Sequence, residues 1–401
     1  MLPRHDRLSY VIGSPDSFSG RPLVTFAPEV RAFLAQLSER LLCDAGAKAF
    51  PDVVSFAWWC RKGNVERQAA AYEDGTLRLG RGVAFHVTPN NIPVNFAFSW
   101  VFSLLAGNAN VVRLPERSFP QIPAILRHVE ALFEGEPYRE IGAMNAFVKY
   151  GREEEIAAAF SRVADIRILW GGDDTIRLLR RAPLPPRGVD VSFADRYAFC
   201  VLGASGILCL GELELSRLVS GFYNDTYLFD QNACSSPHLV VWLGSADEVC
   251  SAQDRFWDSL QAEVVRRYEL APVSAVDKLT QACRDAIELE GCVAGLEHAR
   301  NDLYRLRLER LFAGIENRRC GCGYFYEYIT KDIDDVAPVI TSKFQTVTCH
   351  GVERALLASF VARHRTTGID RIVPVGAAMD IGLIWDGYDL IRTLSRICHV
   401  G

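Results

Sequence analysis

One cysteine of this sequence stands in surroundings that suit a nucleophile. Cys234 lies within Phe229-Asp-Gln-Asn-Ala-Cys-Ser-Ser-Pro237, between a predicted helix at 213–229 and a short apolar strand at 238–243. Small and polar neighbours let backbone N–H groups approach whatever the sulfur attacks, whereas a structural cysteine is usually embedded in apolar residues. Core filler is nevertheless the commoner role of a cysteine, so this segment alone leaves both interpretations open.

A side-chain amide is the second candidate. Thr88-Pro-Asn-Asn91-Ile-Pro93 forms a predicted turn between a strand at 82–87 and a helix that begins at Pro93. An Asn just before a Pro-led helix is a good N-cap, which requires no ligand. Alternatively, the amide stands at the carboxyl edge of a parallel sheet, where it could stabilise the oxyanion of an acyl transfer.

Two further turns have features of a phosphate or nucleotide site. The strand that follows Gly107 ends in Arg113, with Arg117 nearby, although a strand-end arginine can simply be solvated. Gly171-Gly172 opens a helix directly after a strand, which permits close backbone approach to a phosphate or a nicotinamide. A G-x-G-x-x-G fingerprint is absent, so a conventional dinucleotide turn is not predicted.

The elements that position these groups alternate regularly after Gly80. Predicted strands at 82–87, 110–114, 146–150 and 166–169 are each followed by a helical pattern, which is typical of a parallel, doubly wound α/β sheet. Two more strands, at 189–193 and 198–202, are expected to close this first unit. A second α/β series is expected from residue 212, with helices through 275–299, strands near 323–329 and 336–340, and a final helix at 388–397.

Composition excludes several classes of function. The 401 residues are 49% hydrophobic and 23% charged, which suggests a large globular protein of two or three domains. A net charge of −5 with scattered Lys and Arg gives no basic field for nucleic acid. The apolar run at 94–106 is too short to span a membrane, and the first residues do not resemble a signal peptide. We therefore expect a cytoplasmic protein whose 12 cysteines are reduced. Cys320-Gly-Cys322 has no matching Cys/His pair nearby, so no metal site is predicted.

The order of these segments resembles the aldehyde dehydrogenase superfamily, and within it the LuxC-type acyl-CoA (fatty acid) reductases. Pro89-Asn-Asn91-Ile-Pro93 is similar to the superfamily's P-W-N-x-P, whose Asn donates to an oxyanion, and Asn91 takes that place. The stretch from Gly107 to Arg113 is similar to G-N-x-V-V-x-K-P, with Arg113 where a ribose-binding Lys usually stands. Asp230-Gln-Asn-Ala-Cys234 resembles the segment of the catalytic thiol. Residues 344–346 and 371–387 resemble the reductase branch in particular.

The resemblance implies an aldehyde-dehydrogenase-like fold of two three-layer α/β domains with the active site in the cleft between them. Residues 1–204 would form an N-terminal segment and the nicotinamide-cofactor domain, residues 205–375 the catalytic domain, and residues 376–401 a C-terminal segment that packs back on the cofactor domain. Cys234 and Asn91 are the implied catalytic residues. The residues expected to hold the cofactor are Thr88, Pro89, Asn90, Arg113, Arg117, Gly171, Gly172 and Phe344.

The implied activity is NAD(P)H-dependent reduction of an acyl thioester, such as acyl-CoA or an acyl carrier, to an aldehyde through an acyl-cysteine. The resemblance favours NADPH, with NADH as the alternative, since Glu116 could also select NAD. Expected partners are further copies of the chain and an acyl-activating synthetase similar to LuxE. Two rival functions are a CoA-acylating aldehyde dehydrogenase that works in the oxidative direction and an acyl-carrying scaffold subunit.

One departure from the superfamily supports the reductase branch. Where acid-forming dehydrogenases have E-L-G-G-K, this chain has Ser192-Phe-Ala-Asp-Arg196, so the Glu that activates water for deacylation is missing. A reductase has no use for that Glu, because water would consume the acyl-enzyme. The group that deprotonates Cys234 is left open, with His238 and His350 as candidates.

Overall fold

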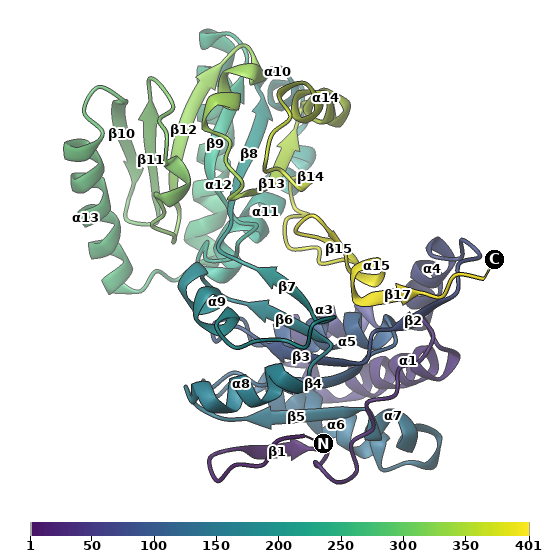
Figure 1. The fold of residues 1–401 in the computed structure, drawn as a ribbon. Coiled ribbons are helices and arrows are strands. Elements are labelled where there is room, and N and C mark those ends of the chain that lie inside the picture. Colours follow the sequence, from purple (N-terminus) through teal and green to yellow (C-terminus); the bar gives the residue numbers. More distant parts are fainter. Residues whose placement is uncertain (1, 401) are drawn as a thin grey trace. The chain divides into compact units, whose positions relative to one another are not determined.

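The computed structural model describes residues 2–400 and divides the chain into two compact units. The first unit contains the residues up to Ala194 together with those from Tyr388 onward, and the second runs from Asp195 to Gly387. Each unit has its own large, mainly parallel β-sheet with helices packed on it (Figure 1).

The sheet of the first unit has six strands in the order β1-β5-β4-β3-β6-β7. Only β1 runs antiparallel to its neighbour. From β3 the chain adds β4 and then β5 on one side, and later β6 and then β7 on the other. This reversal of direction creates a topological switch point beside β3, at whose carboxyl edge open α/β sheets bind ligands. The strands are β1 (Ser9–Ile12), β3 (Val83–Val87), β4 (Ala109–Arg113), β5 (Asn145–Lys149), β6 (Ile166–Trp170) and β7 (Val189–Phe193).

Helices of the first unit connect these strands and cover the sheet (Figure 1). The helix α5 (Asn95–Leu105) is apolar around most of its circumference and almost wholly buried, as expected for a helix enclosed by other elements. The other helices are α1 (Pro28–Cys43), α2 (Ala45–Lys48), α3 (Pro51–Trp59), α4 (Lys62–Ala71), α6 (Gln121–Phe133), α7 (Arg139–Ala143), α8 (Glu154–Val163), α9 (Asp173–Arg180) and α15 (Leu390–Leu394). The final residues return to this unit, where β17 (Ser395–Ile397) pairs antiparallel with β2 (Arg78–Gly80).

The sheet of the second unit has seven strands in the order β10-β11-β12-β9-β8-β13-β14. Its strands are β8 (Tyr197–Gly203), β9 (Pro237–Leu243), β10 (Val293–Ala299), β11 (Leu303–Leu308), β12 (Tyr324–Thr330), β13 (Phe344–His350) and β14 (Arg371–Pro374). The prediction that the strand near 198–202 closes the first unit is wrong. Every residue of β8 is buried, and β8 lies between β9 and β13, because an apolar run of this length needs a parallel neighbour on each side.

Helices cover both faces of the second sheet. The helices α11 (Glu212–Thr226) and α12 (Ala246–Arg267) pack on one face through an aromatic cluster that contains Phe222, Trp242, Phe256 and Trp257. The remaining helices are α10 (Ala204–Leu208), α13 (Pro272–Glu288) and α14 (Arg354–His364). Among the helices of residues 2–400, none is both long enough and apolar enough to cross a membrane.

Three predicted elements differ from the structure. The helix predicted through 275–299 ends at Glu288, because Gly291 takes a positive φ of 74° and the hairpin β10–β11 follows. Residues 336–339 belong to the 3₁₀ segment Ile333–Val339, and Ile340 follows its end. This segment contains Pro338 and therefore lacks a donor that a strand would use. The predicted final helix at 388–397 is divided among β16 (Tyr388–Asp389), α15 and β17.

Candidate active site

The loop that carries Cys234 is held by one buried glutamine. Gln231 has no exposed surface, and its side-chain oxygen accepts hydrogen bonds from the backbone N–H groups of Gly323 and Tyr324, at 3.0 and 3.2 Å. Its amide nitrogen donates to the carbonyls of Pro237 and Tyr324. Asp230 and Gln231 both take positive φ values, of 51° and 61°. The turn is thus attached to the starts of β9 and β12 and places Cys234 at the amino edge of the sheet.

A buried carboxylate, that of Asp225, connects a segment near the C-terminus to the same loop. Asp225 accepts hydrogen bonds from the backbone N–H groups of Gly376 and Ala378, at 2.6 and 2.9 Å, and its own carbonyl accepts from the Ser236 hydroxyl. Burial raises the pKa of Asp225 to about 7. The neighbouring Ser235 hydroxyl faces the sulfur of Met379 at 3.7 Å. Residues 376–379 therefore lie against the segment that follows Cys234.

Charged side chains surround the thiol, which is partly exposed. Burial, and to a smaller extent the negative charge of Asp386, raise the pKa of Cys234 to about 11. The guanidinium groups of Arg196 and Arg319 act in the opposite direction, as does the backbone N–H of Cys234 itself. Asp386 is buried, Gln345 donates to its Oδ1 at 3.0 Å, and its Oδ2 has no hydrogen-bond partner within residues 2–400. The thiol is accordingly protonated at neutral pH until a proton acceptor acts.

Neither histidine considered as that acceptor has suitable surroundings. His350 ends β13 and pairs with Leu202, whereas Pro237, just after the Cys234 loop, pairs with Ala198 at the other end of β8. Ala198 and Leu202 are four residues apart along β8, a distance of about 13 Å. His350 therefore lies at the edge of the sheet opposite to the Cys234 loop. His238 is buried and stacked on Tyr197, and burial lowers its pKa to about 3. It is therefore a weak base.

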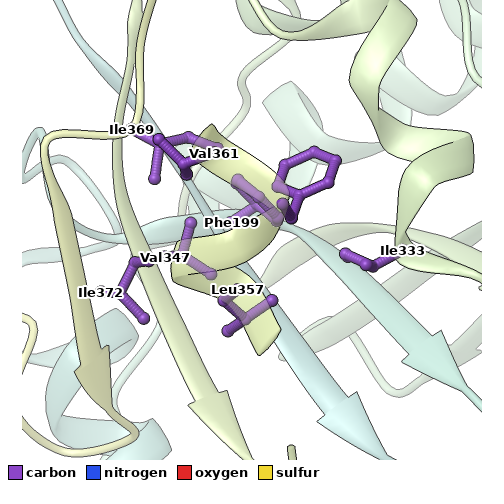
Figure 2. A pocket seen from close by; sticks show the side chains of 8 residues that line it. Phe199, Ile333, Val347, Leu357, Val361, Ile369 and Ile372 are labelled. Carbon is purple, nitrogen blue, oxygen red and sulfur yellow. The ribbon is translucent and has the colours of Figure 1, made fainter. Parts of the chain in front are cut away.

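An apolar hollow lies farther along the same sheet (Figure 2). The space between its side chains has no room for a water molecule, and the lining residues are Phe199, Ile333, Val347, Leu357, Phe360, Val361, Ile369 and Ile372. Ligand pockets usually measure about 300–1,000 Å³. We therefore interpret this space as imperfect packing beneath α14 and assign no substrate to it.

In the first unit, two of the predicted loops meet at the switch point. Thr88 follows β3, and its hydroxyl donates to the carbonyl of Arg113, which ends the neighbouring β4, at 2.7 Å. Asn90 accepts a hydrogen bond from the backbone N–H of Glu116 at 2.9 Å. Pro89 lies between them and is half-buried. The carboxyl ends of β3 and β4 thus form one connected surface.

Arg113 is already engaged within this surface. Its guanidinium lies 2.7 Å from the Glu116 carboxylate, donates to the Gly151 carbonyl at 2.5 Å, and stacks on the ring of Tyr150. The guanidinium still has an unused buried donor, because the Nε of Arg113 has no hydrogen-bond partner within residues 2–400. Arg117 is exposed and lies over the ring of Phe119. Of the two arginines, Arg117 is the one open to an added anionic group.

Asn91 does not cap the following helix. The helix α5 begins at Asn95 and not at Pro93, and its N-cap is Val94, without a side-chain hydrogen bond. The amide of Asn91 is exposed and makes no hydrogen bond with the described residues. The helix-cap interpretation of Asn91 is therefore wrong, and the amide is free to meet a ligand.

The two predicted glycines stand at the carboxyl end of β6, beside β3. A side chain added at Gly171 would meet only Thr175, at an ordinary 3.6 Å, and one at Gly172 would meet nothing. Neither glycine has a positive φ, so the fold itself does not require glycine at these positions. Phe344 lies elsewhere, in the core of the second unit, where its ring packs on Tyr197 and Phe199. Ser192 is buried in β7 and accepts a hydrogen bond from Arg180.

Sequence reasoning missed the residues that support Cys234. Asp225 lies within a helix pattern, and nothing local distinguishes it from a solvated helix residue. Asp386 stands in Trp385-Asp-Gly387. Its positive φ of 52° marks an unusual backbone conformation, which cannot be read from the sequence. Arg371 holds the segment 377–380 in place, because it donates hydrogen bonds to the carbonyls of Ala377, Ala378 and Asp380.

The geometry agrees with what comparison with known proteins finds. The family model described as acyl-CoA reductase (LuxC) matches residues 65–398. The long-chain acyl-protein thioester reductase of Photorhabdus luminescens is 22% identical over 325 residues, which cover 79% of this chain and 62% of that protein. Long-chain acyl-protein thioester reductase 2 of Photobacterium leiognathi is 21% identical over 325 residues, covering 80% of this chain and 64% of that protein. The chain thus spans less than two thirds of the length of these relatives.

Solved structures establish the fold. Lactaldehyde dehydrogenase from Escherichia coli superposes with a TM-score of 0.61 at 12% identity, over 93% of this chain and 85% of that chain. Proline utilization A from Bradyrhizobium japonicum superposes with a TM-score of 0.63 at 16% identity, over 93% of this chain and 42% of the other. Both units therefore have the aldehyde-dehydrogenase-like α/β fold. The chain belongs to the LuxC family of acyl-CoA reductases.

Proposed function

We propose that this protein reduces an acyl thioester to an aldehyde through a covalent acyl-cysteine at Cys234. The observation that carries the proposal is the position of this thiol, which stands at a sheet edge among charged side chains in a chain of the LuxC family. The curated relatives are described as long-chain acyl-protein thioester reductases, which supports a long-chain acyl group on a protein or coenzyme A carrier as substrate.

The reaction begins at the sulfur of Cys234. The thiolate attacks the thioester carbonyl, a new C–S bond forms, and the carrier leaves as a thiol after taking up a proton. A bound nicotinamide cofactor would supply the hydride for reduction. The thiohemiacetal on Cys234 then collapses, so that its C–S bond breaks and the aldehyde leaves. Cys234 ends in its starting state, and two electrons have moved to the acyl carbon.

Asp386 is the proposed acceptor of the thiol proton. Burial raises the pKa of this carboxyl, so its affinity for a proton is higher than that of a solvated aspartate. Its Oδ2 is buried without a hydrogen-bond partner among residues 2–400, which leaves an acceptor atom available. Because the charge of Asp386 acts on Cys234, transfer of the proton removes the carboxylate charge as the thiolate charge appears.

The developing oxyanion needs hydrogen-bond donors. We propose the backbone N–H of Cys234 and the side-chain amide of Asn91 for this role. The support for Asn91 is that its amide is exposed, is not used as a helix cap and has no partner among the described residues.

The carboxyl edge of the first sheet is the proposed site of the nicotinamide cofactor. Its residues suit such a group, because Gly171 and Gly172 leave open space at a helix start and the Nε of Arg113 is a buried donor without a partner within residues 2–400. Thr88, Pro89 and Asn90 would line the same edge. We propose NADPH as the preferred cofactor, with the exposed Arg117 as the cation for its 2′-phosphate. Phe344 is buried in the core of the second unit, so we propose no direct contact between its ring and the cofactor.

The decisive experiment combines substrate and cofactor panels. Purified protein is incubated with acyl-CoA of increasing chain length and with NADPH or NADH, and the absorbance of the reduced cofactor is followed together with aldehyde production. We expect cofactor consumption, aldehyde and free thiol in equal amounts, all abolished in Cys234→Ala. Loss of thioester without aldehyde would contradict the proposal and indicate a thioesterase. An acyl-activating synthetase and further copies of the chain are the partners we propose for the complete reaction.

A further inference from the structure

The helix α13 carries polar side chains on its buried face. Lys278 and Asp285 have no exposed surface. Lys278 donates to the carbonyl of Cys322 at 2.7 Å, and Asp285 accepts from the hydroxyls of Tyr324 and Tyr326, at 2.8 and 2.7 Å. These hydrogen bonds attach α13 to the second sheet, beside the edge strand β10 (Figure 1).

The outward face of the same helix is apolar. Val273, Val276, Leu279 and Ile287 are 65%, 63%, 56% and 77% exposed, and Cys283 is exposed as well. At about 3.6 residues per turn, these side chains fall on one face, opposite Lys278 and Asp285. A surface helix normally shows the reverse arrangement, with its apolar stripe toward the core. A contiguous exposed apolar stripe of this kind marks an interaction surface.

Along the centre of this outward face, the residues are spaced as in a seam between two helices. Val273, Val276, Thr280, Cys283 and Ile287 follow one another at intervals of three, four, three and four residues. This is the repeat with which two helices interlock their side chains over several turns. The stripe is therefore suited to a second helix of the same kind.

Charges beside the stripe select the orientation of that second helix. Asp277 and Arg284 are exposed, lie seven residues apart on the same flank of the stripe, and have no ion-pair partner among residues 2–400. In an antiparallel pair of identical helices, like flanks meet each other. Asp277 of one copy then lies opposite Arg284 of the other, and this ion pair occurs twice. A parallel pair would instead place this flank against the uncharged flank that holds Leu279 and Ala286.

We propose that α13 is a self-association surface, through which two copies of this chain pair with their α13 helices antiparallel. Two alignments of the antiparallel helices allow their side chains to interlock. One places Asp277 near Arg284 of the second copy, and the other places Asp277 near Asp277 of the second copy. The first register brings Val276 opposite Ile287 of the second copy and Thr280 opposite its Cys283. A 17-residue helix is about 25 Å long, so this seam is small beside the about 1,200–2,000 Å² of a stable interface. The association is therefore concentration-dependent.

Charge reversal tests the pairing directly. Sedimentation velocity across a range of protein concentrations measures the dimer dissociation constant of the full chain. Asp277→Arg alone and Arg284→Asp alone should each raise this constant several-fold, because like charges then meet, whereas the two substitutions together should restore it. Ile287→Glu should raise it at least tenfold. Leu213→Glu, at a site on α11 that is 65% exposed, is the matched control and should have no effect.

Cysteine cross-linking tests the register. Thr280→Cys adds a thiol that, in the antiparallel pair, lies opposite the native Cys283 of the second copy. Mild oxidation followed by peptide mapping should therefore link position 280 of one copy to position 283 of the other. A link between the two positions 280 would indicate a parallel pair. That result, a monomer at every concentration, or a dimer insensitive to Ile287→Glu would each overturn the proposal. Unchanged melting temperatures would show that the variants are folded.

Discussion

The Nε atom of Arg196 lies 2.8 Å from Oδ1 of Asp386, and this ion pair stands beside Cys234 with the carboxylate almost wholly buried. The two partners act on the thiol in opposite directions, since the carboxylate raises the pKa of Cys234 and the guanidinium lowers it. Burial has the largest effect on the pKa of the thiol, and a change at this ion pair should alter how much thiolate is present.

Asp386→Asn should lower the pKa of Cys234 from its value of about 11. The thiolate fraction at a given pH below the pKa rises about tenfold for each unit by which the pKa falls. Alkylation of Cys234 by iodoacetamide should therefore become faster, and its pH profile should move to lower pH. Turnover should fall in the same variant, because the proton acceptor is lost. Asp334→Asn, at an exposed surface ion pair, is the control. An unchanged alkylation profile would show that Asp386 does not act on the thiol.

Asn91→Ala should lower turnover by about two to three powers of ten, the usual consequence of removing one oxyanion donor. Because Asn91 does not cap α5, the free energy of unfolding should remain nearly constant. Asn301→Ala, at an exposed turn outside the proposed sites, is the matched control and should leave turnover unchanged. Kinetics and thermal denaturation of both variants check this prediction. A stable, fully active Asn91→Ala protein would remove Asn91 from the mechanism.

Arg117→Ala should raise the KM for NADPH about tenfold or more while the KM for NADH changes little. The exposed guanidinium is the proposed partner of the 2′-phosphate, and a charge-assisted hydrogen bond contributes about 1.5–3 kcal/mol. Arg181→Ala, at the end of α9, is a control for the loss of surface charge. Equal effects on both cofactors would contradict a role in phosphate recognition.

Without cofactor, the acyl-enzyme should persist. The resemblance to the superfamily implies that Ser192 takes the place of the water-activating Glu of acid-forming dehydrogenases, and its hydroxyl accepts a hydrogen bond from Arg180. A thioester substrate should therefore give a burst of about one equivalent of free thiol per active site, and then stop. Mass spectrometry should find the acyl group on Cys234. Steady hydrolysis by the wild-type protein would show that another residue activates water.

The stability of the protein should depend on Asp225. Folding raises the pKa of this carboxyl from 3.8 to about 7, so between these values the folded state binds more protons than the unfolded state. The free energy of unfolding should consequently fall as the pH rises from about 4 to about 7, by at most about 4 kcal/mol. Asp225→Asn should flatten this part of the profile, although it also loses one of the two hydrogen bonds to residues 376–378. Denaturant titrations across the pH range measure the difference.

Local patterns were sufficient for most elements of both units. Mainly apolar segments such as Val83–Val87 and Ile166–Trp170 are buried on both faces, so their strand identity follows from their own residues. Their alternation with helices predicts parallel sheets, and the turns after them carry the candidate cofactor residues. The loop around Cys234 was identified for the same reason, because the small and polar residues that flank the cysteine are its neighbours in sequence.

Tertiary structure alone decided which elements share a sheet and which charges meet. Nothing in the residues of β8 shows that it joins β9 and β13 instead of β7, because a fully buried strand carries the same apolar signal in either sheet. Asp225, Arg196 and Asp386 are far apart in sequence, and their pKa values depend on burial and on neighbours that only the folded chain provides. The sequence by itself determined the family of the protein and its candidate nucleophile. The surroundings of that nucleophile depend on long-range contacts, which no local pattern records.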